Sequence, residues 1–248
     1  MLIDSHIHLS DDEYTSIENE VIDMLKALDI KAISVSMDTN TSRRNLSLAE
    51  RYNDVIIPFV GLHPWCIEYE DIDSFTSFIL SNIDKIKGIG EIGLDAAYSS
   101  DYKKQKIVFE SMLSIAEKYK KPVSIHSRRA IDDVLAVLSS YKLNGVLLHW
   151  FSGSKKQLIK ANDMGYYVSY GPVLVYSEEK RMLLRNSNID LVLIETDGPV
   201  RYSSCFNNSM ALPSFLVSVA YALSDTLNMH YSDAEEILLK NSLRYLNC

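Results

Sequence analysis

The chain opens with Ile3-Asp4-Ser5-His6-Ile7-His8-Leu9, in which two histidines lie two residues apart in a run typical of a β-strand. Alternate side chains of a strand point to the same face, so we expect His6, His8 and Asp4 to share one. Two imidazoles on one face make half of a metal site. Two ordinary histidines at a solvent-exposed strand end are the alternative. The choice depends on what the rest of the chain brings to the same place.

Apolar, β-branched runs alternate with amphipathic stretches along the whole chain. We expect eight strands, at Leu2–His6, Ala32–Met37, Val55–Gly61, Lys87–Ile92, Val123–His126, Val146–Trp150, Tyr166–Tyr170 and Leu191–Glu195. Helical patterns lie between them, at Ser16–Leu28, Arg43–Tyr52, Ile72–Asn82, Tyr102–Tyr119, Ala130–Tyr141, Lys155–Met164 and Glu178–Arg185, and two more follow at Leu212–Thr226 and Asp233–Leu246.

Near-continuous apolar strands separated by helices predict a parallel sheet that is buried on both faces. Eight such units in an undivided chain of 248 residues favour a (β/α)8 TIM barrel with an extra C-terminal helix over an open doubly wound sheet. No Pro/Gly/Ser-rich linker or charge block divides the chain, so we expect a single domain over residues 1–248. The polar stretch Gly198–Ala211 is expected to be an irregular binding loop.

The composition indicates an acidic globular protein, with 47% hydrophobic residues and a net charge of -8. An acidic protein binds nucleic acid only through a local positive site or bound cations. The three cysteines, Cys66, Cys205 and Cys248, are far apart and odd in number, which indicates neither a disulfide framework nor a cysteine-based zinc site. We expect a cytoplasmic protein with no signal peptide, no membrane span and no obligate protein partner.

Polar residues collect where the predicted strands end, which in such a barrel is where the chemistry lies. Five of the six histidines are at strand ends, and only His230 is elsewhere, in a turn. Two carboxylates, Glu91 and Asp197, join them. These ligand types suit Zn, Mn or Mg, and they are too many for one tetrahedral site. Two metal ions bridged by a carboxylate are the economical interpretation.

Motifs at these strand ends resemble those of the TatD-like metal-dependent deoxyribonucleases, a branch of the amidohydrolase-type barrels. The resemblance covers nearly the whole chain. It is carried, in order, by Asp4–Leu9, Gly61–Pro64, Gly90–Asp95, Gln105 with Phe109, Pro122–Arg128, His149–Gly153 and Glu195–Pro199. The chain departs from the family pattern at Trp150, Val200 and Met112 and in the loop Gly198–Ala211. In the family, the loop after the eighth strand helps to form the substrate groove.

The resemblance implies a set of roles and a dinuclear centre of divalent ions (Zn, Mg or Mn). His6, His8 and Asp197 would bind one ion, His126 and His149 the other, and Glu91 would bridge them and take part in catalysis. Asp197 would orient or deprotonate the attacking water. His63, also expected to be catalytic, would contact the scissile phosphate or help the proton transfers. The expected activity is hydrolysis of DNA phosphodiesters, as a 3′-exonuclease or an endonuclease, with single-stranded DNA or 3′ ends as substrate.

Three further residues are candidates for substrate binding. Arg128 shares a face with His126, and its guanidinium matches phosphate oxygens, although a salt bridge to a rim carboxylate would explain it too. Trp65 and Tyr202 are expected to stack against bases. We expect Asp4 and Glu195 to be buried hydrogen-bonding partners behind the ligands rather than ligands themselves.

Two other functions fit the same residues. A dinuclear site can also hydrolyse carboxylic esters, amides or lactones, including aminoacyl esters of tRNA. A glutamate at position 91, where many amidohydrolase barrels use a carbamylated lysine, favours the nuclease branch by analogy. The third possibility is a binding or scaffold protein that has kept the barrel, and the apparently complete ligand set argues against it.

Overall fold

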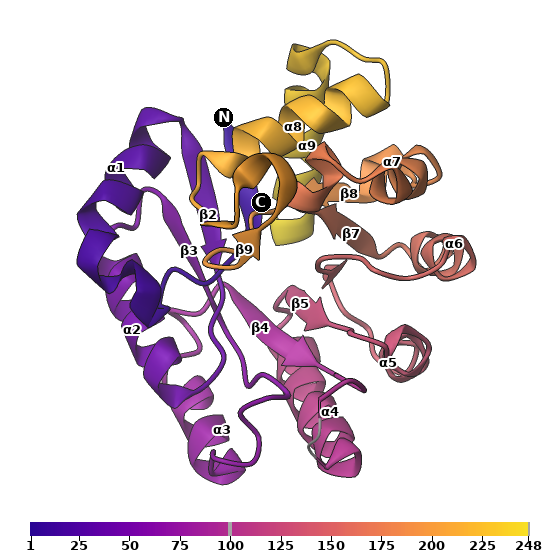
Figure 1. Cartoon of the computed structure of the whole chain (residues 1–248). Coiled ribbons are helices and arrows are strands. Elements are labelled where there is room, and N and C mark those ends of the chain that lie inside the picture. The colour runs from indigo at the N-terminus through magenta and orange to yellow at the C-terminus, as the bar shows by residue number, and fades with distance from the viewer. Residues whose placement is uncertain (99–100, 248) are drawn as a thin grey trace.

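Eight parallel strands, hydrogen-bonded in chain order, form the centre of the computed structural model, which describes residues 1–98 and 101–247 (Figure 1). The strands are β1 (Leu2–Ile7), β2 (Ile30–Ser34), β3 (Ile56–Val60), β4 (Gly88–Gly93), β5 (Val123–His126), β6 (Val146–Leu148), β7 (Tyr167–Tyr170) and β8 (Val192–Ile194). The helices around them are α1 (Glu18–Ala27), α2 (Thr39–Arg51), α3 (Ile72–Ser81), α4 (Tyr102–Lys118), α5 (Ile131–Leu138), α6 (Lys155–Asp163), α7 (Glu178–Arg185), α8 (Phe215–Thr226) and α9 (Tyr231–Leu246). The predicted TIM barrel with an extra C-terminal helix is confirmed.

Side-chain hydrogen bonds join the last strand to the first. The buried carboxylate of Asp4 accepts hydrogen bonds from the backbone N–H (3.0 Å) and the hydroxyl of Thr196, which follows β8. The hydroxyl of Ser5 donates to the backbone carbonyl of Ile194 at 2.8 Å. These contacts bring the ends of β1 and β8 side by side, and they show Asp4 as the buried polar partner that the sequence predicts.

The barrel interior is filled by side chains on one face of the strands. Leu193 of β8 belongs to a small inner cluster, whereas its neighbours Val192 and Ile194 pack in the larger outer cluster, as strand alternation requires. The inner cluster contains Ile3, Ile33, Val35, Phe59, Leu147, Tyr167, Leu193 and Tyr245. Tyr245 comes from α9, and its hydroxyl donates to the carbonyl of Val123 at 2.9 Å. Because side chains fill the barrel interior, a substrate can enter the protein only at the rim, where the strands end.

Two segments differ from the sequence-based expectation. Helix α2 begins four residues earlier than predicted because Asp38 and Thr41 form a reciprocal capping box, with the Asp38 carboxylate accepting from the Thr41 N–H at 2.8 Å. The loop after β8 is not irregular throughout. It contains an antiparallel pair, β9 (Arg201–Tyr202) and β10 (Ser209–Met210).

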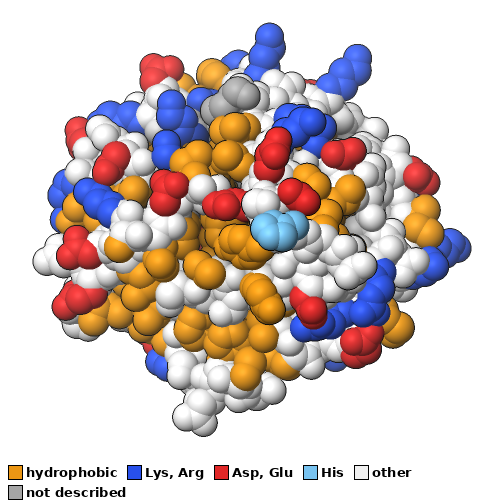
Figure 2. Space-filling model, turned by 90° about the horizontal axis from the view of Figure 1, so that it is seen from above, with side chains coloured by type: hydrophobic (Ala, Val, Ile, Leu, Met, Phe, Trp, Pro, Cys, Tyr) orange, Lys and Arg blue, Asp and Glu red, His pale blue; other side chains and the backbone are white. Residues whose placement is uncertain are grey.

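The surface carries no single dominant charge on the side shown in Figure 2, where hydrophobic side chains gather in the middle and Lys and Arg lie mostly toward the edges among acidic residues. No helix within the described residues is long and apolar enough to cross a membrane. Cys66 and Cys205 are free thiols, and Cys248 lies outside the described residues.

Candidate metal centre

A pocket of about 740 Å³ lies at the rim where the strands end, and its wall contains most of the predicted ligands. The predicted ligands that line it are His8, Glu91, His126, His149 and Asp197. His6 is fully buried against them. The structure therefore brings together residues that are up to 191 positions apart in the chain, from 6 to 197.

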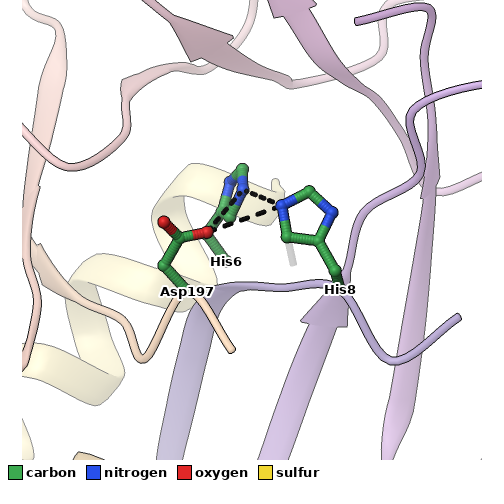
Figure 3. A group of neighbouring side chains, drawn as sticks. All are labelled: His6, His8 and Asp197. Carbon is green, nitrogen blue, oxygen red and sulfur yellow. Dashed lines mark hydrogen bonds and ion pairs between the residues drawn. The ribbon is translucent and has the colours of Figure 1, made fainter. Parts of the chain in front are cut away.

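One group of donors is formed by His6, His8 and Asp197, whose side chains point toward one another (Figure 3). The two Nε2 atoms of the histidines are 3.3 Å apart. Asp197 Oδ1 lies 3.6 Å from the Nε2 of His6 and 3.5 Å from that of His8. Three donors at these separations can face one ion from one side.

Glu91 lies between this group and the remaining histidines, with one carboxylate oxygen facing each side. Its Oε2 is 3.5 Å from His6 Nε2 and 3.3 Å from His8 Nε2. Its Oε1 is 2.7 Å from His126 Nδ1 and 2.8 Å from His149 Nε2. A carboxylate in this position can bridge two cations, one held by each group.

The strand pairing is irregular beside the two candidate ligands that lie within a strand, His6 in β1 and Glu91 in β4. The register of β1 on β2 shifts between Asp4 and Ile7, around His6, and that of β4 on β5 shifts between Ile89 and Ile92, around Glu91. Bulges of this kind re-aim side chains and are frequent beside active sites. A strictly regular strand would not turn both ligands into the pocket while keeping the apolar residues on either side in the core.

Asp197 is held in place by the backbone around it. Its φ is 48°, in the left-handed region, so the chain turns sharply at this residue. Its N–H donates to the carbonyl of His6 at 2.9 Å, and the N–H of His8 donates to the carbonyl of Gly198 at 2.8 Å. The carboxylate is thereby fixed beside the two histidines of β1.

The ring of His6 is oriented by its second nitrogen. His6 Nδ1 is 2.8 Å from the hydroxyl of Ser124. With the proton on Nδ1, the lone pair of His6 Nε2 faces the centre. Glu195, predicted to hydrogen-bond to a ligand histidine, instead stands 3.8 Å from His149 Nδ1, and this nitrogen has no hydrogen-bond partner among the described residues. It accepts hydrogen bonds from the N–H of Trp150 (2.8 Å) and from the hydroxyl of Ser169.

The charges in this pocket favour a bound cation. Burial acts to raise the pKa of Glu91, but the His63 and His149 imidazoles outweigh it and hold that pKa well below its usual value. Burial acts to lower the pKa of His8, but Asp197 and Glu91 outweigh it and raise that pKa to about 9. The carboxylates thus hold a proton on an imidazole that must be neutral to bind a metal, and a divalent ion would take over the role of that proton. The donor set fits such ions in chemistry as well as in spacing.

His63 lies closer to the donors than a substrate-binding role alone requires. Its Nε2 is 3.2 Å from Glu91 Oε1, and with Glu91 and His126 it forms a further close group of donors. Burial lowers the pKa of His63 to about 4, so the ring is neutral at neutral pH. The residue lines the pocket, where a neutral imidazole can bind a phosphate oxygen through an N–H.

The structure separates the three predicted substrate-binding residues. Trp65 and Arg128 both line the pocket. Tyr202 does not line it: only 2% of Tyr202 is exposed, and its hydroxyl donates to the carbonyl of Thr196 at 2.9 Å. The expectation that Tyr202 stacks against a base is therefore corrected, because β9 carries the ring into the core beneath the rim. Arg201, the other residue of β9, lines the pocket instead and pairs with Glu13.

Asp95, which ends the Gly90–Asp95 motif, is a polar partner of the candidate ligands that the sequence-based set of site residues does not include. Its Oδ2 accepts hydrogen bonds from the Trp65 indole N–H (2.7 Å) and from His126 Nε2 (3.0 Å). Its Oδ1 accepts from the N–H groups of Ala97 (2.8 Å) and Tyr98 (3.1 Å). The carboxylate holds the far side of the His126 ring, so that Nδ1 faces Glu91.

We expect Asp95→Asn to weaken the binding of divalent ions by about 10- to 100-fold. An asparagine offers one acceptor oxygen, so its NH2 group would face either the ring donors or the two backbone N–H groups. Isothermal titration with Zn²⁺ or Mn²⁺ measures the change. Trp65→Phe is the matched control, because it removes one of the four donors and leaves the bond to His126. Equal affinities of Asp95→Asn and the parent protein would contradict the positioning role.

The chain is similar to known proteins both in sequence and in fold. The model of a family described as TatD related DNase matches residues 3–247. A Bacillus subtilis protein, the uncharacterized metal-dependent hydrolase YabD, is 30% identical over 251 residues, which cover 98% of each chain. The human deoxyribonuclease TATDN3 is 27% identical over 213 residues, covering 80% of this chain and 78% of that protein. The crystal structure of YJJV, a TatD homologue from Escherichia coli K12, has the same fold, with a TM-score of 0.92 at 24% identity over 100% of this chain and 98% of that one.

Proposed function

This chain belongs to the family of TatD related DNases, and on that premise we propose that it is a metal-dependent hydrolase of DNA phosphodiesters with a dinuclear centre. One observation carries the proposal: the two oxygens of the buried Glu91 carboxylate face two separate groups of histidines. A human relative with the name deoxyribonuclease supports DNA as the substrate.

Two groups of residues would hold the ions. His6, His8 and Asp197 would hold one, His126 and His149 the other, with Glu91 shared between them. Divalent ions held there supply Lewis-acid activation of a water molecule and of the phosphate, which is the chemistry of an in-line phosphodiester displacement.

The chain's own residues complete the reaction. Asp197, fixed beside His6 and His8, is placed to accept the proton of the attacking water. As the new P–O bond forms, the bond from phosphorus to the departing sugar oxygen breaks. His63 in the pocket wall and Arg128 at its edge would bind the non-bridging oxygens, where negative charge increases. Single strands and 3′ ends are the substrates that we expect, because an unpaired end can enter a pocket on the barrel rim.

Removal of metal is expected to lower cleavage of a labelled single-stranded oligonucleotide by at least about a thousandfold, since several kcal/mol of charge stabilisation is lost. The test compares protein treated with EDTA with the same protein after Mg²⁺, Mn²⁺ or Zn²⁺ is restored. Product mapping from both labelled ends distinguishes exonuclease from endonuclease action.

Carboxylic esters and lactones, assayed beside the oligonucleotide, are the control for the alternative reaction. Metal-dependent cleavage of these compounds without cleavage of DNA would replace the nuclease by an esterase or lactonase on the same site. Full oligonucleotide cleavage in EDTA would refute a metal-dependent mechanism.

A further inference from the structure

A second cleft, of about 580 Å³, adjoins the metal pocket between the first turns of α5 and α6. The two hollows share Arg128 and Ser152 in their walls, so a ligand that leaves the metal pocket over these residues enters the second cleft directly. Arg129, Gly153 and Gln157 are among the residues that line only the second cleft. We call it the α5–α6 cleft.

The two arginines at this cleft are exposed and have no ion pair within residues 1–98 and 101–247. Six other arginines each lie within 4.0 Å of a carboxylate, namely Arg44, Arg51, Arg181, Arg185, Arg201 and Arg244. In an acidic protein, two adjacent guanidiniums without such partners beside a catalytic pocket are available to an anionic ligand.

Carboxylates in the α5–α6 cleft are already engaged by neighbouring groups. Asp132 Oδ2 accepts from the Gln157 amide at 2.9 Å. Asp133 Oδ2 accepts from the Tyr102 hydroxyl at 2.7 Å and lies 3.3 Å from Lys106 Nζ. The Lys106 ammonium partly compensates the charge of Asp133, and neither carboxylate forms an ion pair with Arg128 or Arg129 among the described residues.

The opposite side of the metal pocket has the reverse charge. Asp11 and Glu13 line it there, at the start of the short 3-10 helix Asp12–Ile17. Arg201, the cation on that side, is paired with Glu13. A polyanion is therefore repelled from this side and attracted toward α5 and α6. The exposed lysines Lys155 and Lys156, at the start of α6, add positive charge next to the cleft.

We propose that the α5–α6 cleft is a second phosphate subsite, in which Arg129 binds a phosphodiester of the same strand whose scissile phosphate lies at the metal centre. The proposal rests on the proposed function and extends it, because it makes the preferred substrate a polynucleotide strand rather than a molecule with one phosphate. Arg128, shared by both hollows, would contact the strand between the two phosphates.

The test compares two substrates that react at the same centre. One is a single-stranded thymidine oligonucleotide, and the other is the p-nitrophenyl ester of thymidine 5′-monophosphate, which has one phosphate and cannot span both sites. Arg129→Gly is the informative variant. The φ of Arg129 is 54°, a conformation in which glycine is unstrained, so the substitution removes the guanidinium without a backbone penalty.

For Arg129→Gly we expect the ratio of kcat/KM on the oligonucleotide to that on the ester to fall about tenfold, through a higher KM for the oligonucleotide. The slope of log KM against log salt should decrease by about 0.7, the contribution of one phosphate contact on a single strand. Arg129→Lys should restore most of the ratio. Arg185→Ala, on the exposed face of α7, removes the same charge far from the cleft and should leave the ratio unchanged.

An unchanged ratio and salt slope in Arg129→Gly, with the oligonucleotide still cleaved, would refute the subsite and leave the nuclease function intact. An equal fall in Arg185→Ala would refute it as well, since net charge alone would then explain the effect. If the parent protein cleaves the ester but no oligonucleotide, both the subsite and the DNA nuclease function fail.

Discussion

Replacing Glu91 by glutamine is expected to reduce phosphodiester hydrolysis by about a thousandfold or more and to reduce the number of divalent ions bound. The glutamine amide has one oxygen and one NH2 group, so the NH2 group must face either His6 and His8 or His126 and His149. The NH2 group cannot coordinate a cation, so the bridge between the two groups of histidines is lost. The substitution also removes one full negative charge from the site. A loss of 4 kcal/mol in transition-state stabilisation corresponds to roughly a thousandfold in rate.

Steady-state kinetics and metal analysis of the purified variant measure the two effects together. Glu178→Gln makes the same chemical change on an exposed carboxylate of α7 and should leave both values as they are. Circular dichroism shows whether the Glu91 variant keeps its fold, so that a loss of activity can be assigned to the site. A Glu91→Gln protein with two bound ions and full activity would overturn the bridging role.

Gly93→Ala is expected to destabilise the barrel by about 3–5 kcal/mol and to disable the site at the same time. Gly93 has a φ of 145°, which L side chains rarely adopt, and a Cβ there would lie 2.0 Å from the carbonyl oxygen of His126. That contact lies within the β4–β5 pairing, between the strand that carries Glu91 and the strand that ends in His126. Strands β4 and β5 must separate to accept the methyl group, and the distance between Glu91 Oε1 and His126 Nδ1 must increase.

Urea denaturation measures the change in the free energy of unfolding, with Gly165→Ala as the matched control. Gly165 also has a positive φ, 76°, but an added Cβ there meets no atom within 4 Å. Its substitution therefore tests backbone strain alone, about 1 kcal/mol. If the two alanine variants were equally stable, the close packing of β4 against β5 would not explain the loss of stability in Gly93→Ala.

The positions of the strands and the meeting of the candidate ligands can be predicted from the sequence because both follow simple rules. The apolar runs have the length and spacing of barrel strands, and in a parallel barrel every strand end lies on one rim. His6 and Asp197 could therefore be placed together without knowledge of any contact between them. The end of β6 was less accurate: the expected strand reached Trp150, whereas β6 ends at Leu148. The φ of Trp150 is 41°, so the chain turns just after His149, and this turn leaves no signal in the hydrophobic pattern.

Long-range side-chain contacts were the part that the sequence could not reveal. The role of Tyr202 depends on the β9–β10 pair, whose strands have two residues each and are too short to show a periodicity. Asp95 left a clearer signal. It closes a motif that also contains Glu91, and Gln105, a residue of the next motif, accepts from the Asp95 N–H and donates to its carbonyl. These two adjoining motifs thus indicate that Asp95 is a polar partner of the candidate ligands.

The contacts between β1 and β8 also make the candidate centre depend on the order in which the chain is synthesised. His6 and His8 are synthesised almost two hundred residues before Asp197 and the Thr196 that binds Asp4. A nascent chain still short of that point lacks the third donor beside His6 and His8, and β1 lacks its second neighbour. Such a chain, or a fragment cut before this point, would lack the complete candidate centre, which needs β8 and Asp197 as well as β1.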